Sequence, residues 1–367
     1  MKKIFIFLMI LVTILLTGCG KDNSNDIFKD LTDKINKLDS YTLDGNLEVK
    51  NNNTNYTYKV TVDFMKKDKF KVSLTNTSNN HEQVILRNDD GVFVLTPSLN
   101  KSFKFQSDWP YNNSQIYLLG SIIDDLNNDK DLETLEEDGK YIYISKVNYP
   151  NNPDLVKQRV TVNSDLLIEK VEVLNADGEA EMIFTVNSTD YAPTFDESYF
   201  EVNSIINTNN NNNNQSTDNN TNKQEENNSS EENKNTNTEE ETKQEEGTEQ
   251  TATIEDIIYP LYLPTGTTLQ DQEKVSKTDG ERVILTFGGE KSFTLVEETV
   301  SIEDELTIIP TYGEPLQVND TIGAVTDNSL NWISGNIEYY MVSDTMDSQE
   351  LLEIASSINV ESVSSLK

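Results

Sequence analysis

The sequence is short of the residues on which catalysis most often depends. Its 367 residues include one cysteine, Cys19, and one histidine, His81. One cysteine excludes an intramolecular disulfide and a thiolate metal cluster, and we expect no cysteine nucleophile. His81 lies in the polar loop 77–83, where we interpret it as solvated, and no G-x-S-x-G, P-loop or HExxH pattern occurs. The sequence therefore predicts that the protein is not an enzyme and that it holds no cofactor.

Long apolar runs are equally scarce, and the only one stands at the start. Ile4–Leu16 follows Lys2 and Lys3. At thirteen residues this run is shorter than the roughly 20 that a membrane-spanning helix needs, and it is typical of a signal peptide. Nothing later in the chain is apolar enough to span a membrane.

The leader ends in Leu16-Thr-Gly-Cys19, with small residues directly before the cysteine. This pattern resembles the lipobox of bacterial lipoproteins, in which cleavage leaves a diacylglycerol-modified cysteine as the new N-terminus. Two acyl chains give stable anchoring. We therefore predict a signal peptide at 1–18, lipid attachment at Cys19 and a tether at 19–25. The mature chain is then expected at the outer face of the cell membrane.

The chain also has few positive charges. It carries 29 basic and 64 acidic side chains, for a net charge of −35. Such a chain is repelled by nucleic acid and by anionic lipid headgroups. We expect no nucleic-acid partner, and contact with the membrane only through the N-terminal lipid.

Residues 208–253 contain no Val, Ile, Leu, Phe, Tyr or Trp and are rich in Asn and Glu. A segment that can bury nothing cannot offset the entropy of ordering, so we predict a disordered linker. It divides the chain into a domain at 26–207 and a smaller one at 254–367. We expect few contacts between these two domains.

The first domain is predicted to be a large antiparallel sheet with two helices. Apolar residues recur at helical spacing in 28–38 and again in 115–126. The remaining apolar segments alternate and are separated by turn residues. We therefore predict an α+β fold with a large curved antiparallel sheet, a half-open barrel with packed helices. The expected strands are Tyr41–Lys50, Tyr56–Phe64, Lys69–Thr75, Glu82–Arg87, Gly91–Leu95, Tyr141–Val147, Gln158–Val162, Leu167–Leu174 and Ala180–Thr189.

The second domain is predicted to be a small α+β unit. A helical turn is expected to begin at Thr253 and to end at Pro260, and a helix is expected over Ser348–Ile358. Asp347 and Glu350 are spaced as a capping box at the start of that helix. The expected strands are Arg282–Phe287, Phe293–Val300, Thr307–Ile309, Thr321–Val325, Leu330–Ser334 and Ile337–Val342.

Four segments of the first domain carry a family signature: Asp90–Pro97, Lys101–Gln106, Asp108–Pro110 and Asn148–Pro150. With the order of helix, strands, inserted helix and strands, they resemble the LolA-like lipoprotein-sorting carriers. The similarity is greatest to the Gram-positive branch that includes the clostridial spore germination lipoproteins, and it covers most of 26–203. The resemblance implies a concave apolar surface that holds acyl chains or a protein partner. Carriers are soluble shuttles, so an anchor at Cys19 argues against shuttling.

The second domain has its own signature in Tyr262–Gly266, Leu330–Ile333 and Leu351–Ile358. These residues resemble an uncharacterised domain common at the C-terminus of Gram-positive lipoproteins and anti-sigma-like proteins. The resemblance implies a fold and no activity.

One pattern is close to that of a calcium loop. Asp125, Asn127, Asp129 and Glu136 stand at positions 1, 3, 5 and 12, but Lys130 occupies position 6, where the loop needs glycine. Lys130 would also place a positive charge beside the ion. We interpret the segment as a polar connection from helix to strand and predict no metal site.

The candidate binding residues are aromatic: Phe93, Phe103, Phe105, Trp109 and Tyr111. Trp109 follows a Phe-rich strand and precedes a proline, so we expect its ring at the rim of the concave face. Core packing is the alternative for each residue. The sequence thus predicts an envelope protein that binds a protein partner, such as a cell-wall hydrolase or a germination component. The second hypothesis is binding or carriage of a lipid or another hydrophobic ligand, which a deep apolar cavity would favour.

Overall fold

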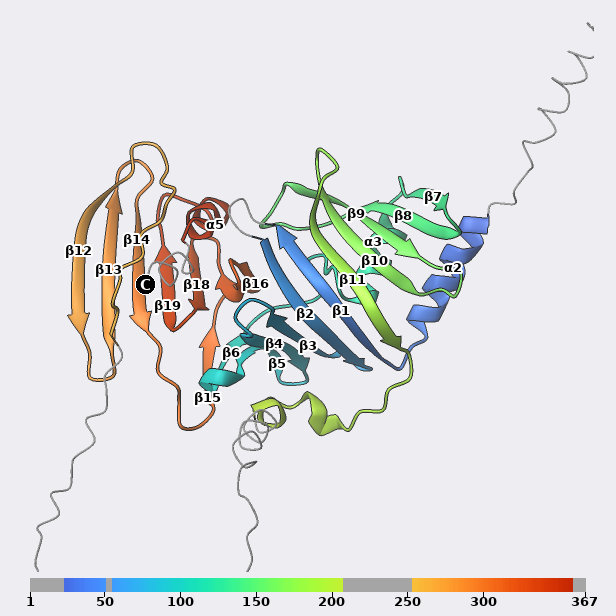
Figure 1. Cartoon of the computed structure of the whole chain (residues 1–367), viewed down its shortest axis with the longest axis horizontal. Helices are drawn as coiled ribbons and strands as arrows, with labels where there is room; N and C mark the ends of the chain where they lie inside the picture. Colours follow the sequence, from blue (N-terminus) through green and yellow to red (C-terminus); the bar gives the residue numbers. More distant parts are fainter. Residues whose placement is uncertain (1–22, 51–54, 207–252, 359–367) are drawn as a thin grey trace, which may run out of the picture. The chain divides into compact units, whose positions relative to one another are not determined.

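A computed structural model describes three stretches of the chain, 23–50, 55–206 and 253–358 (Figure 1). The predicted leader, Cys19 and nearly all of the predicted linker lie outside the described residues. Contacts divide the chain into two compact units. The first unit comprises Met1–Asn80 with Asp108–Thr194, and the second comprises His81–Ser107 with Phe195–Lys367. Within the described stretches, no helix has the length and apolar character required to span a membrane.

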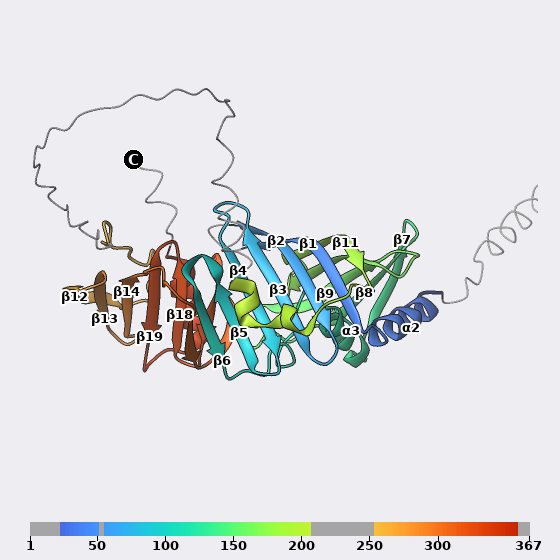
Figure 2. The same ribbon diagram turned by 90° about the horizontal axis from the view of Figure 1, so that it is seen from below.

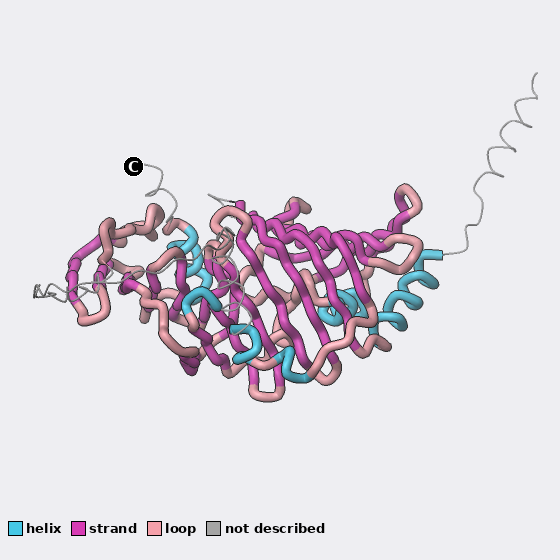
Figure 3. Tube along the Cα trace, turned by 60° about the horizontal axis from the view of Figure 1, so that its bottom comes forward, coloured by secondary structure: helices cyan, strands magenta, loops and turns pink. Residues whose placement is uncertain are grey.

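Eight strands of the first unit form a curved antiparallel sheet in the order β3-β2-β1-β11-β10-β9-β8-β7. Figure 3 shows these strands curving around helix α3. The elements are α2 (Asn23–Asn36), β1 (Ser40–Lys50), β2 (Asn55–Met65), β3 (Lys69–Asn76), α3 (Leu119–Asn128), β7 (Glu133–Glu137), β8 (Lys140–Lys146), β9 (Leu155–Val162), β10 (Ile168–Asn175) and β11 (Ala180–Asp190).

The inner face of this sheet is packed by the chain's own side chains. Alternate residues of β1, β2, β3 and β9 are buried, as expected for a sheet with one apolar face. Helix α3 lies along the inner face (Figure 2) and buries its apolar stripe there. The buried residues of this stripe are Leu119, Ile122, Ile123 and Leu126, each 0–1% exposed.

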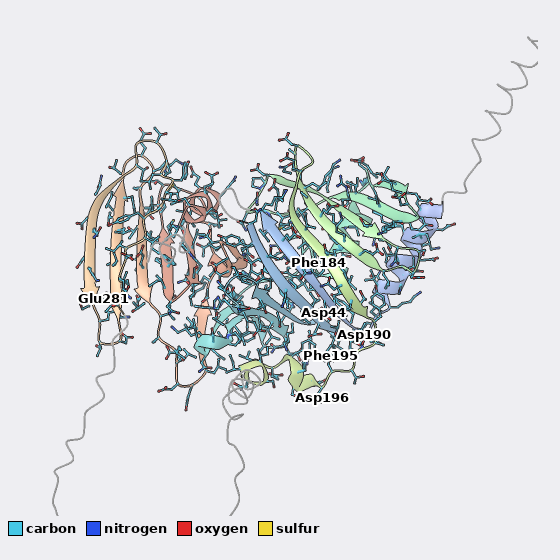
Figure 4. The ribbon with its side chains drawn as sticks, viewed as in Figure 1. Asp44, Phe184, Asp190, Phe195, Asp196 and Glu281 are labelled. Carbon is cyan, nitrogen blue, oxygen red and sulfur yellow. The ribbon has the colours of Figure 1, made fainter. Side chains whose placement is uncertain are left out.

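A close approach between β1 and β11 requires a glycine. A Cβ at Gly45 would lie 2.5 Å from the ring of Phe184 and 2.6 Å from the carbonyl oxygen of Thr185. The pairing shifts by one residue between Asp44 and Gly45, as in a β-bulge. Figure 4 labels Phe184 and Asp44 on these neighbouring strands. The outer face is polar, and Thr61 there donates a hydrogen bond to Asp44 at 2.8 Å.

The second unit contains two sheets. One has the order β15-β6-β5-β4, and β15 runs parallel to β6. The other has seven strands in the order β12-β13-β14-β19-β18-β17-β16. The elements are β4 (Glu82–Asn88), β5 (Gly91–Thr96), η1 (Pro97–Leu99), β6 (Lys101–Phe105), η2 (Glu197–Phe200), β12 (Thr268–Ser276), β13 (Glu281–Gly288), β14 (Phe293–Thr299), β15 (Thr307–Thr311), β16 (Glu314–Val318), β17 (Thr321–Val325), β18 (Ser329–Ser334), β19 (Ile337–Val342) and α5 (Ser348–Ser356).

The predicted start of the C-terminal helix is confirmed. Asp347 accepts from the backbone of Glu350, and the Glu350 side chain accepts from the backbone of Asp347, which completes a capping box. Leu351, Ile354 and Ala355 of α5 are buried in the core of the seven-stranded sheet. This core also contains a stacked pair of rings, Trp332 and Tyr339, with centroids 5.0 Å apart.

The α+β class and the curved antiparallel sheet agree with the predicted fold. The predicted helical turn at 253–260 is wrong, because these residues form no helix. No strand was predicted at β7, β12 or β16. The expectation of few contacts between the two predicted domains is wrong as well, because residues 81–107 share a compact unit with the C-terminal part of the chain.

Candidate functional site

The five predicted aromatic residues do not share one environment. Phe93, Phe105 and Trp109 are buried, Phe103 is half-buried and Tyr111 is 58% exposed. Phe93, Phe103 and Phe105 belong to β5 and β6 of the second unit, whereas Trp109 and Tyr111 belong to the first unit.

Trp109 is a core residue of the first unit. Its side chain is 1% exposed and meets Phe70 edge-on, with ring centroids 6.1 Å apart. Phe70 continues the row to Phe64 and then to Tyr41, each at 5.0 Å. The expected rim position of Trp109 is therefore wrong, and core packing is the correct alternative. Tyr111 is the exposed member of the predicted set, and its hydroxyl donates to the carboxylate of Asp68.

Phe103 and Phe105 face residues from the C-terminal part of the chain. With Gln83 and Val94 they line a small hollow that has room for about one water molecule. Its other walls are formed by Ile322–Ala324 of β17 and Asn331–Ile333 of β18. Phe103 and Phe105, two of the residues predicted to bind a partner, are thus already covered by residues of the same chain.

A buried amide specifies this intramolecular contact. The Gln83 Oε1 atom accepts from the backbone N–H of Ile322 at 2.6 Å and from the hydroxyl of Thr321 at 2.7 Å. The Gln83 Nε2 atom donates to the Ile322 carbonyl at 3.1 Å. All three groups are buried, so each would be costly to leave unpaired. Sequence reasoning missed Gln83, whose partners lie 238 and 239 residues away.

Strand β15 makes a second attachment, along the edge of β6. Five consecutive pairs join Thr307–Thr311 to Lys101–Phe105 in parallel register. Glu303, in the segment before β15, forms two backbone hydrogen bonds with the residues before β6. The Glu303 N–H donates to the Leu99 carbonyl at 3.2 Å, and the Glu303 carbonyl accepts from the Asn100 side chain at 2.7 Å. The Glu303 carboxylate lies 3.7 Å from Lys101 Nζ, whose side chain is only 10% exposed.

Exposed apolar residues gather on the segments that flank β15. Ile302 is 70% exposed and Tyr312 is 76% exposed, while Ile308 within the strand is 45% exposed. These three exposed side chains lie within the eleven residues 302–312, which makes this stretch a candidate binding surface.

A second exposed apolar stretch is the segment 254–263, which forms no helix or strand and is here called the strap. Glu281, labelled in Figure 4, accepts from the N–H of Ile254 at 2.8 Å, and Glu297 accepts from the N–H of Ile258 at 3.1 Å. Bonds to Ser357 hold the other end of the strap. The strap turns three large side chains outward: Tyr259, Leu261 and Tyr262.

Two carboxyl groups, one buried and one half-buried, have a raised pKa. Glu297 is 1% exposed, and burial raises its pKa to about 7. Burial also raises the pKa of Asp125 on α3 to about 6, while a hydrogen bond with Ser114 acts in the opposite direction. Glu297 accepts from the backbone of Ile258, and Asp125 forms a hydrogen bond with the Ser114 hydroxyl, so each carboxyl group serves a structural contact.

The calcium-like residues do not form a cage. Asp125 and Asn127 lie in α3, Asp129 ends the helix and Glu136 lies in β7. The Asp129 carboxylate accepts from the backbone N–H groups of Asp131 and Lys146, which lower its pKa. Across the three described stretches, no group of three or more His, Cys, Asp or Glu side chains is placed to hold a metal ion. His81 is half-buried, and burial lowers its pKa.

The chain has known relatives. A family model described as "Sporulation protein YdcC-like" matches residues 1–200. The sporulation protein YdcC of Bacillus subtilis is 32% identical over 364 residues, which cover 98% of each chain.

Similar solved structures include the Pseudomonas aeruginosa MucA/MucB complex, with 12% identity, a TM-score of 0.30 and coverage of 92% of this chain and 98% of that chain. Another is the CwlD amidase of Clostridioides difficile in complex with the GerS lipoprotein, with 18% identity, a TM-score of 0.26 and coverage of 47% and 94%. A third is a LolA superfamily protein of Nitrosomonas europaea, with 12% identity, a TM-score of 0.29 and coverage of 48% and 98%. The sequence-based resemblance named the sorting carriers and the germination lipoproteins, and both occur among these neighbours. At such TM-scores the similarities do not define a shared function.

Proposed function

Because the chain belongs to the family of YdcC-like sporulation proteins, we propose that it is a non-catalytic envelope lipoprotein that binds a partner protein during sporulation. Cys19 attaches it to the outer face of the cell membrane. The partner is an envelope protein, for which a cell-wall hydrolase is our first candidate.

One observation carries the choice of a protein partner over a lipid. The inner face of the curved sheet is filled by α3, whose apolar stripe is 0–1% exposed. Trp109, the ring expected at the rim of that face, is buried too. A carrier needs an apolar cavity of several hundred Å³ for acyl chains. Instead, large apolar side chains are exposed in the second unit, at Leu261, Ile302 and Tyr312.

Site-specific cross-linking tests the proposal. A photo-reactive amino acid is placed at Leu261, Ile302 or Tyr312 in a spore-forming host, with the exposed polar Lys59 of β2 as the matched control position. We expect protein adducts at the apolar positions during sporulation and none at Lys59. Lipid extraction of the purified protein is done in parallel. Stoichiometric bound lipid without any protein adduct would favour the carrier hypothesis and refute this proposal.

A further inference from the structure

The edge of β6 is where two parts of the chain far apart in sequence meet. β15 lies beside β6 in the parallel register Thr307↔Lys101 to Thr311↔Phe105 (Figure 1). Every other neighbouring pair described in the second unit's two sheets is antiparallel. β15 therefore reaches β6 from a distant part of the chain, whereas β5 reaches it through a short connection.

We propose that β15 is an exchangeable edge strand and that the β6 edge which it covers is the partner-binding site, which accepts an extended apolar segment of the partner protein in place of β15. This proposal rests on the proposed function and names the site for it. Addition of an extended peptide to a sheet edge is a common mode of recognition, in which main-chain bonds give affinity and side-chain positions give specificity.

The first argument is that the β6 edge already pairs with an extended segment, β15, which places an apolar residue beside Phe103. The Thr307 N–H donates to the Asn100 carbonyl at 2.9 Å. With the two-residue period of a strand, Thr307, Ile309 and Thr311 fall on the same face as Lys101, Phe103 and Phe105. Phe103 packs against a small apolar cluster of Leu99, Val300 and Ile333. An incoming segment therefore needs an apolar residue at the position of Ile309.

The second argument is that β15 is lightly held compared with its neighbours. It is five residues long, and none of them is buried. Residues 300–306, before it, form no regular element, and Ile302 and Tyr312 on either side are more than two-thirds exposed. Segments with few buried apolar contacts open at low free energy.

The third argument is that the segment directly before β15 makes specific contacts with the residues at the start of β6. The Glu303 carboxylate faces the nearly buried Lys101 ammonium at 3.7 Å, and the Glu303 backbone is bonded to Leu99 and Asn100. Lys101 is thus a fixed positive charge beside the edge. The fitting partner segment carries a carboxylate four residues before the residue that takes the place of Thr307.

A labelled peptide of residues 301–312 tests the proposal without knowledge of the partner. The receptor is the full chain with Cys19→Ser, in which residues 302–312 are replaced by a Gly-Ser segment of equal length. The locked form carries Ser102→Cys and Ile308→Cys, a registered pair whose Cα separation in a sheet suits a disulfide. Ser102 suits this change because its buried hydroxyl has no hydrogen-bond partner among the described residues.

We expect the peptide to bind the replaced chain and not the oxidised locked chain, with binding restored to the locked chain by reduction. Peptides with Glu303→Lys or Ile309→Ser should bind about tenfold or more weakly, as for an anchor residue at an interface. Equal binding to locked and replaced chains would overturn the proposal. So would absence of binding to a replaced chain that melts cooperatively.

If the replaced chain does not fold, hydrogen exchange of the intact chain tests whether β15 is exchangeable. The amides of β15 and of the β6 edge should exchange faster than those of β5, and the disulfide should remove the difference. Uniform exchange in the absence of the disulfide would refute an exchangeable strand. These outcomes do not depend on whether cross-linking in cells finds a partner, so failure of the proposed function would be recognised separately.

Discussion

The side chain of Gln83 forms hydrogen bonds with both backbone groups of Ile322. It accepts from the N–H at 2.6 Å and donates to the carbonyl at 3.1 Å. These residues stand 239 positions apart, and the segment 207–252 lies between them in the sequence. This pairing explains why β4 and β17 belong to one compact unit.

Gln83→Leu should destabilise the second unit by about 2–3 kcal/mol, because buried backbone and hydroxyl groups lose their partners. The sequence has two tryptophans, of which Trp332 lies in the second unit. Urea unfolding followed by fluorescence in a Trp109→Phe background therefore reports on that unit. The control is the exposed Gln270, whose change to Leu should cost less than about 0.5 kcal/mol. Equal costs at Gln83 and Gln270 would contradict the described hydrogen bonds.

Cleavage of the linker should not separate the chain into independent parts. A specific protease site introduced within 208–252 would give two fragments, which we expect to elute together in size-exclusion chromatography. The hydrogen bonds of Gln83 to Thr321 and Ile322 and the packing of Phe103 against Ile333 should hold them together. Cleaved chain that carries Gln83→Leu should dissociate at lower urea concentration. Separate elution of wild-type fragments in native buffer would show that these contacts are too weak to matter.

Trp109→Ala should cost about 3–5 kcal/mol of stability in the first unit, as for a large aromatic side chain removed from a core. The physical reason is its burial against Phe70. Thermal melting measures the loss. Tyr111→Ala is the matched control, since Tyr111 is 58% exposed, and we expect a change of at most about 1 kcal/mol. An unchanged melting temperature of the Trp109→Ala protein would contradict the core position of Trp109.

Glu297 should make the second unit less stable as pH rises from about 5 to 8. Burial raises the pKa of this carboxyl from 4.5 to about 7, so the folded chain binds the proton more tightly than the unfolded chain does. Between these values, stability falls with rising pH, by up to about 3 kcal/mol in all. Glu297→Gln keeps an acceptor for Ile258 and removes the titration.

Urea midpoints at several pH values should therefore show the Glu297→Gln variant equal to wild type near pH 5 and more stable at pH 8. Comparison with wild type at each pH removes the contribution of other titrating groups, such as Asp125. A constant difference between the two proteins at all pH values would be incompatible with a raised pKa at Glu297.

Cys19→Ala should release the chain from the membrane or block its processing, because the remaining chain is strongly acidic. Membrane fractions washed at high salt provide the measurement, with Ser24→Ala as a control downstream of the predicted cleavage site. Full membrane retention of the Cys19→Ala protein would disprove the lipid anchor.

Local sequence patterns predicted the local structure well. The capping box of Asp347 and Glu350 specified the start of α5, because both partners lie within one helical turn. Alternation predicted most strands whose inner face is apolar. It failed for β12, where eight of nine residues are exposed and no alternation remains, and for the acidic β7.

Local sequence patterns did not predict structure that depends on contacts between residues far apart in the sequence. The segment 253–260 has apolar spacing suited to a helical turn, but in the structure its backbone N–H groups bond to Glu281 and Glu297 and it forms no helix. The sequence identifies the aromatic residues, but their exposure depends on other residues that cover them in the fold. Trp109 is covered by Phe70, and Phe103 faces β17 and β18, from a part of the chain more than 200 residues later.

Pro310 gives β15 a further property. The Thr307 N–H faces β6, so by the period of the strand the N–H at position 310 would face away from the sheet. Proline has no N–H to offer there. β15 is the last strand in its sheet order, and its outer border therefore lacks a donor that a second molecule would need in order to align. The edge of this sheet thus ends in a strand that is poorly suited to pairing with a second copy of the chain.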